Sequence, residues 1–416
     1  MTEQLLQRYR DTREQSLAFC EPLATEDYGL QAEAFTSPPK WHLAHTTWFF
    51  ETFLLKPFQE GYQTPEPRYE VLFNSYYNGI GAQHPRSRRG LLSRPTVMEV
   101  SDYRQQVDMG IERLLAETGH PARADILERV TLGIEHERQH QELFFTDLKY
   151  SLAVNPLLPT YVEGPVTGNS DAVVQSWHAF EGGLLETGFN GQGFCFDNEL
   201  PRHRNYVEPF ELAGRLVTNG EFAEFIADGG YRRPELWLAD GWEAVQTQGW
   251  AAPHYWLERD GQDLEYTLHG LQPRIDANPV CHVSGYEADA FARWANARLP
   301  TEHEWELAAA TAAAPEGGVD TGHYHPQPAA DESGLRQLYG ECWQWTQSAY
   351  SPYPGYRASP GAIGEYNGKF MSSQWVLRGG SCVSKADHVR SSYRNFFYPP
   401  DRWQFSGIRL ARSNQS

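Results

Sequence analysis

The pattern of hydrophobic and polar residues changes character near residue 155. Before that point, apolar residues recur at spacings of three and four over residues 2–20, 41–57, 98–117 and 122–151, which is typical of amphipathic helices. Breaks rich in Pro, Gly and Asn separate the four stretches, so each one predicts a separate helix. Four helices of this length predict an up-down bundle, and bundle cores are a usual place for a metal ion.

The second part of the chain has short apolar segments, frequent Gly and Pro, and many Trp and Tyr residues. Only two helices are predicted there, Thr218–Asp228 and Ser284–Arg298. Residues 156–175 are rich in turn-forming residues and predict a linker. The sequence therefore predicts a four-helix bundle over residues 1–155 and an irregular α+β domain with large loops over residues 176–416.

The composition of the chain mainly excludes some classes of protein and partner. The 416 residues are too many for one ordinary core, which agrees with two domains. The 54 acidic and 35 basic side chains give a net charge of −19, which argues against nucleic acid or an anionic membrane as a partner. No apolar run approaches the roughly 20 residues of a membrane span. The beginning of the chain predicts a charged helix, not a signal peptide. The five cysteines are scattered and predict neither a disulfide framework nor a metal site, so we expect a cytoplasmic protein.

The strongest chemical signal is a pair of histidines in the last predicted helix. His136 and His140 stand four residues apart in His-Glu-Arg-Gln-His, so both project from one helix face and can bind one metal ion. The downstream third-ligand pattern of the known zinc proteases is absent. Two solvated histidines on a polar face have the same spacing, so the pair alone leaves both interpretations open.

A third ligand has to come from another segment, and the second predicted helix offers His42 and His45. Both lie among aromatic residues in Trp41-His-Leu-Ala-His-Thr-Thr-Trp-Phe-Phe. Histidines on such a face are expected to be buried and to need polar partners. A hydrogen-bonded core histidine remains an alternative for each.

A long loop between the second and third predicted helices carries Tyr76, Tyr77, Arg86, Arg88 and Arg89 in an otherwise acidic protein. Arginine can hold a carboxylate by two parallel hydrogen bonds. Tyrosine can transfer a proton close to a metal site. The alternative is a solvated basic loop whose tyrosines pack on the bundle, although its glycines would let the backbone approach a ligand.

Several motifs resemble known families. The bundle resembles the DinB-like metal-binding domain, with Leu43-Ala-His45 and His136-x-x-x-His140 at the ligand positions. The second part resembles the formylglycine-generating-enzyme-like (sulfatase-modifying-factor) domain, a variant of the C-type lectin fold. Its motifs here include Arg298-Leu-Pro-Thr-Glu-His-Glu-Trp-Glu, Gly340-Glu-Cys-Trp-Gln-Trp-Thr and Leu377-Arg-Gly-Gly-Ser-Cys. In this order the two domains resemble the EgtB-type sulfoxide synthases of ergothioneine biosynthesis, as do Asn74-Ser-Tyr-Tyr-Asn, Gly364-Glu-Tyr-Asn-Gly-Lys-Phe-Met and Tyr393-Arg-Asn-Phe-Phe-Tyr-Pro.

This resemblance implies an oxygen-dependent formation of a C–S bond. Hercynine (Nα-trimethylhistidine) and a thiol would be joined at the imidazole C2 as a sulfoxide, with O2 as co-substrate. The family's non-haem iron(II) would be held by His45, His136 and His140, while His42 would be a packing residue. Three imidazoles leave positions open for substrates, unlike a closed four-ligand zinc site.

The resemblance also implies roles for residues around the iron. Tyr76 or Tyr77, with Tyr76 preferred, would donate the proton that prevents simple dioxygenation of the thiol. Arg86 and Arg89 would hold the carboxylate of the thiol substrate. The residues expected to contact hercynine are Gln139, Asn395 and Phe396, the last by a cation–π contact. Ordinary packing and loop hydrogen bonding remain alternatives for these three.

One departure from the family bears on the thiol donor. Relatives that use γ-glutamylcysteine have Trp-Asp after the position of Asn395, and their aspartate helps to hold the larger donor. Phe396 and Phe397 stand there in this chain, and its paired tyrosines come from the bundle loop, so both features indicate free cysteine. The alternatives are a γ-glutamylcysteine or selenosugar donor, histidine as the acceptor as in ovothiol synthesis, a DinB-like zinc thiol transferase or hydrolase, and a non-catalytic lectin-like binding protein.

Overall fold

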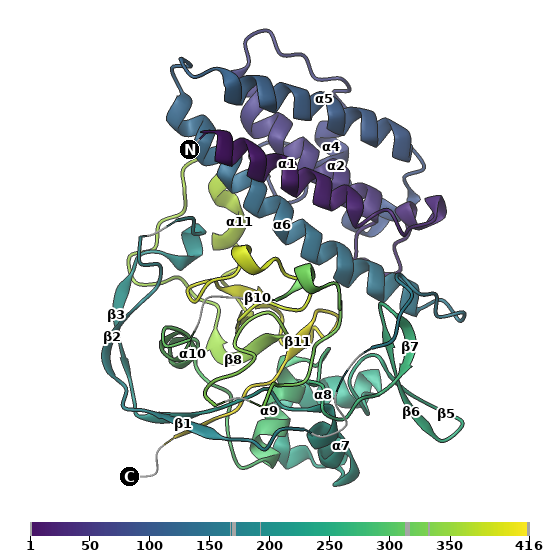
Figure 1. Ribbon diagram of the computed structural model, residues 1–416, viewed down its shortest axis with the longest axis vertical. Helices are drawn as coiled ribbons and strands as arrows, with labels where there is room; N and C mark the ends of the chain where they lie inside the picture. Colours follow the sequence, from purple (N-terminus) through teal and green to yellow (C-terminus); the bar gives the residue numbers. More distant parts are fainter. Residues whose placement is uncertain are drawn as a thin grey trace. The chain divides into compact units, whose positions relative to one another are not determined.

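The computed structural model describes residues 2–413, except residues 167, 169–171, 192, 313–316 and 332. The chain forms two compact units, drawn in Figure 1. The helical unit comprises Met1–Val162 and Pro360–Glu365, and the mixed unit comprises Glu163–Ser359 and Tyr366–Ser416. The predicted linker at 156–175 includes residues outside the described ones, and its bounds stay a prediction.

Four long helices build the helical unit, as the periodicity predicts. They are α1 (Thr2–Ala18), α2 (Pro39–Phe50), α5 (Val97–Ala116) and α6 (Arg123–Ala153). A π-helical turn (Glu51–Leu55) and α3 (Lys56–Phe58) continue α2, and the shorter pieces are η1 (Thr25–Gly29), α4 (Tyr69–Phe73) and η3 (Arg86–Leu91). Pro39 is the first residue of α2, a position that needs no backbone N–H donor.

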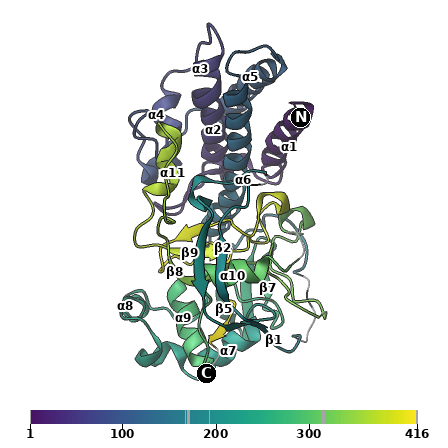
Figure 2. The same cartoon turned by 90° about the vertical axis from the view of Figure 1, so that its left-hand side faces the viewer.

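Helices α2 and α6 pack directly on one another and run side by side in Figure 2. Gly133 of α6 permits this approach, because a Cβ atom there would lie only 2.4 Å from the ring of Phe50 on α2. The rings of Trp48, Phe49 and Phe50 are buried, and those of Phe49 and Phe50 lie against His136 and Gly133 of α6. This close contact brings the histidine-bearing parts of both helices together. No described helix is long and apolar enough to cross a membrane.

The described residues of the mixed unit form four small sheets. They have the strand orders β1-β4-β12, β10-β9-β8-β11, β2-β3 and β5-β6-β7. All pairs are antiparallel except β11 with β8. The strands are β1 (Trp177–Phe180), β2 (Gly183–Thr187), β3 (His203–Val207), β4 (Phe210–Ala213), β5 (Trp256–Arg259), β6 (Gln262–Thr267), β7 (Gly270–Pro273), β8 (Trp343–Ala349), β9 (Trp375–Arg378), β10 (Asn395–Phe397), β11 (Ser406–Gly407) and β12 (Ala411–Ser413).

The helices of the mixed unit are more numerous than the periodicity predicts. The two predicted ones are present as α7 (Asn219–Ala227) and α9 (Gly285–Trp294). Helix α9 ends earlier than predicted, where Asn296 has a left-handed φ of 52°. Sequence periodicity misses α8 (Ala239–Gln248), α10 (Glu302–Ala309) and α11 (Glu365–Gly368). Helices α10 and α11 are short, and α8 contains Gly241 and few large apolar residues, so none shows a clear apolar repeat.

A capping box begins α10, and this signal is readable in the sequence. Thr301 accepts a hydrogen bond from the backbone N–H of Glu304, and the Glu304 carboxylate accepts one from the N–H of Thr301. Trp305 of this helix packs with Phe210 and Leu212 of β4 in a buried apolar core. The result is the irregular α+β architecture that the sequence predicts.

Candidate metal centre

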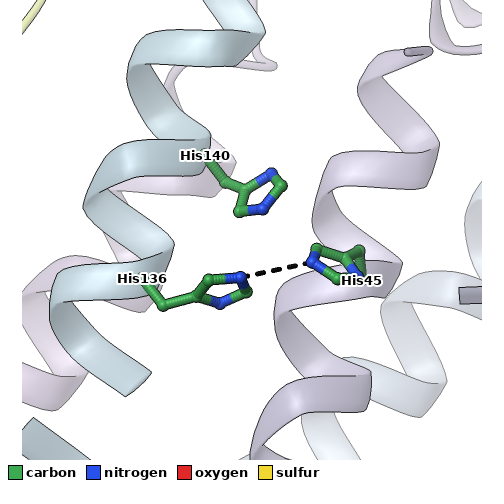
Figure 3. A group of neighbouring side chains, drawn as sticks. All are labelled: His45, His136 and His140. Carbon is green, nitrogen blue, oxygen red and sulfur yellow. Dashed lines mark hydrogen bonds between the residues drawn. The ribbon is translucent and has the colours of Figure 1, made fainter. Parts of the chain in front are cut away.

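Three histidines converge between α2 and α6 of the helical unit. His45 projects from α2 towards His136 and His140 of α6, as Figure 3 shows. One ring nitrogen of each lies within 4.8 Å of the other two. In the described part of the chain, no other group of three His, Cys, Asp or Glu side chains meets this distance.

The distance between the nitrogens fits a shared ion. His45 Nε2 and His136 Nε2 are 3.2 Å apart. Two nitrogens bound to one ion at about 2.1 Å, with an angle of about 100° between them, lie about 3.2 Å from each other. The side chains need no rearrangement to present both lone pairs to one cation.

All three imidazoles are neutral at neutral pH. Burial lowers the pKa of His136 to about 4. Burial, with the neighbouring imidazoles adding to it, also holds the pKa values of His45 and His140 well below their usual range. A neutral imidazole keeps one nitrogen lone pair, which is the form that binds a metal ion.

The rings are held in place by their surroundings. His45 Nδ1 donates to the carbonyl oxygen of Phe73 at 2.6 Å, which leaves Nε2 for the metal. The Trp41 ring stacks on His45 with centroids 4.5 Å apart, and the Phe49 ring stacks on His136 at the same distance. The donor set of three fixed, neutral imidazoles fits iron(II) and also other divalent ions of the first transition row.

Glu137, between the two α6 histidines in sequence, belongs to a different network. It accepts hydrogen bonds from Arg13 at 2.8 Å, Arg104 at 2.5 Å and Ser16 at 2.6 Å. Burial opposes its ionisation, but the two guanidinium groups outweigh this effect and lower its pKa to about 2. Glu137 is therefore a buried structural anion, in agreement with the absence of a protease-type base.

Arg89 lies close to the histidines. It donates to the hydroxyl oxygens of Ser37 at 2.9 Å and Ser75 at 3.3 Å. Its guanidinium carbon lies 3.4 Å from the ring centroid of Trp41, which stacks on His45. Arg89 is buried, and no carboxylate among the described residues forms an ion pair with it. Burial and the neighbouring Arg86 lower its pKa to about 9, so an anionic ligand would stabilise its charge.

Arg86 and Tyr76 contact each other directly. The Nη1 of Arg86 donates to the Tyr76 hydroxyl oxygen at 2.7 Å, and its Nη2 donates to the carbonyl oxygen of Phe35. Both side chains are half-buried, whereas Arg88 of the same 3-10 helix is exposed. The structure therefore separates Arg88 from the two arginines that we expect to hold a carboxylate.

Tyr77 has a different environment from Tyr76. Its ring is buried and packs against Trp48 and Phe53, with centroid distances of 5.7 and 5.1 Å. The loop itself is ordered by Asn74, whose side chain donates to the carbonyl oxygens of Tyr77 and Gly81. The alternative of a solvated loop with tyrosines packed on the bundle thus holds in part, since Tyr77 packs on the bundle whereas Arg89 of the same loop is buried.

A residue far away in sequence also holds the tyrosine loop. The carboxylate of Glu365 accepts hydrogen bonds from the backbone N–H groups of Asn78 at 2.9 Å and Gly79 at 2.8 Å. A Cβ atom on residue 79 would lie 2.6 Å from Glu365 Oε1, so a larger residue there would require the Glu365 carboxylate to shift. Glu365 stands in one of the motifs typical of the family, which gives that motif a structural purpose.

The residues predicted to contact hercynine are divided between the units. Gln139 is half-buried on α6, next to His140. Asn395 and Phe396 lie on β10 of the mixed unit, where the Phe396 ring stacks on Tyr350 at 4.1 Å. The preceding Arg394 is anchored by hydrogen bonds to the buried Glu302. Their contribution to the histidine site stays a prediction.

Sequence reasoning missed the part played by His42. Its Nδ1 lies 2.9 Å from Nδ1 of His140, and its Nε2 lies 3.1 Å from the carboxylate of Asp147. A signal was present in the sequence, since His140 and Asp147 are seven residues apart and share a face of α6.

Comparisons with known proteins agree with this architecture. The family model of the DinB superfamily matches residues 8–144, and that of the sulfatase-modifying factor enzyme 1-like domain matches residues 169–333 and 321–414. The chain is 32% identical over 414 residues to hercynine oxygenase of Mycolicibacterium smegmatis, covering 92% of both chains. It is 31% identical over 407 residues to hercynine oxygenase of Mycobacterium tuberculosis, again covering 92% of both. The formylglycine-generating enzyme of Streptomyces coelicolor is 30% identical over 269 residues, which are 53% of this chain and 83% of that enzyme. The predicted pair of domains is confirmed, and the chain belongs to the family of EgtB-type sulfoxide synthases, the hercynine oxygenases.

Proposed function

We propose that this protein is an iron(II)- and O2-dependent sulfoxide synthase that joins hercynine to L-cysteine in ergothioneine biosynthesis. The product is hercynylcysteine sulfoxide. The observation that carries the proposal is the buried cluster of His45, His136 and His140 in a chain whose relatives are hercynine oxygenases. The five cysteines of the chain are free thiols, which fits the reducing cytoplasm where we place the reaction.

The overall reaction balances without a further reductant. The C2–H bond of the hercynine imidazole and the S–H bond of cysteine are broken, and one C–S bond forms. One oxygen atom of O2 becomes the sulfoxide oxygen, and the other leaves as water with the two hydrogens. Bound iron(II) would supply the one-electron chemistry that allows O2 to react with a thiol and an imidazole.

The arginines are suited to bind the carboxylate of cysteine. Arg89 is a buried cation held beside Trp41 and the histidines without an ion-pair partner among the described residues. Arg86 lies close enough to lower the pKa of Arg89. A carboxylate between the two guanidinium groups would relieve this repulsion and fix the position of the thiol.

Tyr76 is the better candidate for the proton donor. Arg86 donates to its oxygen, so the hydroxyl hydrogen is directed away from the guanidinium and can be given to a reacting group. The Tyr77 ring is instead packed against Trp48 of α2 and Phe53 of the following π-helical turn. We assign Tyr76 the proton transfer that favours sulfoxide formation over oxidation of cysteine alone.

Hercynine would be bound by Gln139, Asn395 and Phe396. The Phe396 ring lies in an aromatic cluster with Tyr350 and Phe370, whose ring centroids are 4.1 and 5.9 Å away, and such rings can contact a trimethylammonium group by cation–π interactions. Phe397 supplies an apolar ring, packed on Trp403, where relatives that use γ-glutamylcysteine have an aspartate. This difference supports free cysteine as the donor.

The direct test is oxygen uptake by the anaerobically iron-loaded protein with hercynine and cysteine, followed by mass analysis of the product. We expect one O2 consumed for each hercynylcysteine sulfoxide formed. γ-Glutamylcysteine, a selenosugar donor, and histidine as the acceptor are run in parallel. A preference for one of these would replace the assigned substrate, and no uptake with any imidazole acceptor would refute the sulfoxide synthase.

A further inference from the structure

Asp147, His42 and His140 form a continuous hydrogen-bonded chain that ends at the histidine cluster. The Asp147 carboxylate oxygen Oδ2 is 3.1 Å from His42 Nε2, and His42 Nδ1 is 2.9 Å from His140 Nδ1. Oδ2 also accepts a hydrogen bond from the backbone N–H of Ser37 at 2.8 Å. Both Asp147 and His42 are buried, so solvent does not compete for these contacts.

The positions of the hydrogens follow from the inventory of donors and acceptors. Oδ2 of Asp147 accepts from Ser37, so His42 Nε2 carries the hydrogen and donates to it. Nδ1 of His140 faces His42, so Nε2 is the nitrogen that His140 has left for a metal ion. A ligand nitrogen holds a lone pair, so the hydrogen of His140 lies on Nδ1, which donates to Nδ1 of His42.

We propose that His42 and Asp147 are positioning residues that fix the tautomer and ring orientation of His140 as a metal ligand. The backbone carbonyl of Phe73 fixes the tautomer and orientation of His45 in the same way. For His140 the acceptor is the side chain of His42, which is oriented by the carboxylate of Asp147. Partners of this kind orient ligands and raise their basicity in metal sites.

His42 is a partner of a ligand and not itself a ligand. It lies outside the group of three histidines whose nitrogens converge. Both of its ring nitrogens are already engaged, one with Asp147 and one with His140. The inference rests on the metal site of the proposed function, but on neither of its substrates.

The test compares His42→Phe with His42→Asn. The side-chain oxygen of asparagine can take the place of Nδ1 and accept from His140, whereas phenylalanine keeps a flat ring and offers no acceptor. Affinities for Zn(II), Co(II) and Fe(II) are measured by competition with a chromophoric chelator. We expect the Phe variant to bind about 10–100-fold more weakly than the wild type and the Asn variant to stay close to it.

Several results would overturn the proposal. One is a Phe variant that binds the metal ions as tightly as the wild type does. Another is an equal loss of metal affinity in the Phe and Asn variants. If His42 were a ligand, the Co(II) absorption bands would change in both. Should the Phe variant not fold, Asp147→Leu removes the acceptor for His42, and Asp147→Asn keeps an oxygen there. The Leu variant is then expected to lose affinity and the Asn variant to retain it, and equal affinities would refute the assignment. A wild-type protein that binds no metal would instead refute the proposed function.

Discussion

Helix α6 carries two polar networks on neighbouring faces, and they differ in completeness. On one face, the Glu137 carboxylate is surrounded by Arg13, Arg104 and Ser16, so its charge is balanced within the chain. On the other, His136 and His140 direct lone pairs towards His45. A buried polar group without a partner is costly. We therefore propose that the first network stabilises the fold and that a bound ligand completes the second.

Buried arginines make the same distinction. Arg89 has no carboxylate partner, and its Nε has no acceptor among the described residues. Arg409 of the mixed unit also lacks a carboxylate, but its donors meet Gln344 Oε1 and two backbone carbonyl oxygens. The lack of a carboxylate is thus not sufficient evidence by itself. We propose Arg89 as a binding residue because it lies beside the three histidines, against the Trp41 ring that stacks on His45.

The largest expected effect comes from removing one of the proposed ligands in the histidine network of α6. His136→Leu keeps the volume of the side chain but removes the donor nitrogen. We expect sulfoxide formation to fall to the level without enzyme and bound iron to fall below one per chain, while the metal-free protein stays folded because leucine fills the space of the imidazole. Metal analysis and product mass measure this, and a variant that keeps both full iron and activity would contradict the assignment.

A change in the Glu137 network should lower the stability of the protein and leave metal binding unchanged. Glu137→Gln leaves two buried guanidinium groups without their anion, so we expect a loss of about 3–5 kcal/mol in the free energy of unfolding. Urea unfolding at neutral pH measures this loss, and metal stoichiometry provides the control. A variant of unchanged stability but reduced metal content would reverse the roles of the two faces.

This stability difference should also depend on pH. The pKa of Glu137 in the folded protein is about 2, below its ordinary value of 4.5. The stabilisation by its ionised form is therefore present above about pH 4.5 and is lost as the pH falls towards 2. The difference between wild type and Glu137→Gln should shrink over that range.

Near the histidine cluster, Tyr76→Phe should change which product forms more than it changes the binding of the substrates. Without the hydroxyl, we expect the ratio of sulfoxide to cysteine sulfinate to fall by about 100-fold, the lower end of what a positioned proton donor contributes. Tyr77→Phe is the matched control, since it removes a hydroxyl from the packed neighbour. The product ratio, measured by mass spectrometry, should stay unchanged in the control. The opposite result would move the role to Tyr77.

The smallest of these effects is expected at the arginines. Arg89→Met should raise the KM for cysteine about tenfold, which corresponds to about 1.4 kcal/mol, and should leave the KM for hercynine unchanged. Arg88→Met is the control, because Arg88 is exposed in the same 3-10 helix. Steady-state oxygen uptake measures both constants. A larger effect on hercynine would show that Arg89 binds the other substrate.

Local periodicity makes the four bundle helices and the His136–His140 pair predictable from the sequence. The period of 3.6 residues places positions i and i+4 on one face whatever the helix packs against. Helices α8 and α10 escape this reasoning because their few large apolar residues, such as Trp242 and Val245 of α8, do not form a repeat. Family motifs supplied the assignment of His45, the tyrosines and the arginines.

The tertiary structure decided how these pieces meet. His42 and His45 are three residues apart and share a face of α2, so the sequence alone does not tell which one reaches the cluster. The close approach at Gly133 and Phe50 sets the position of α2 against α6. It turns His45 to the cluster and His42 to His140 and Asp147. Spacing along one helix is a local property of the chain, whereas a contact between two helices depends on packing over their whole length.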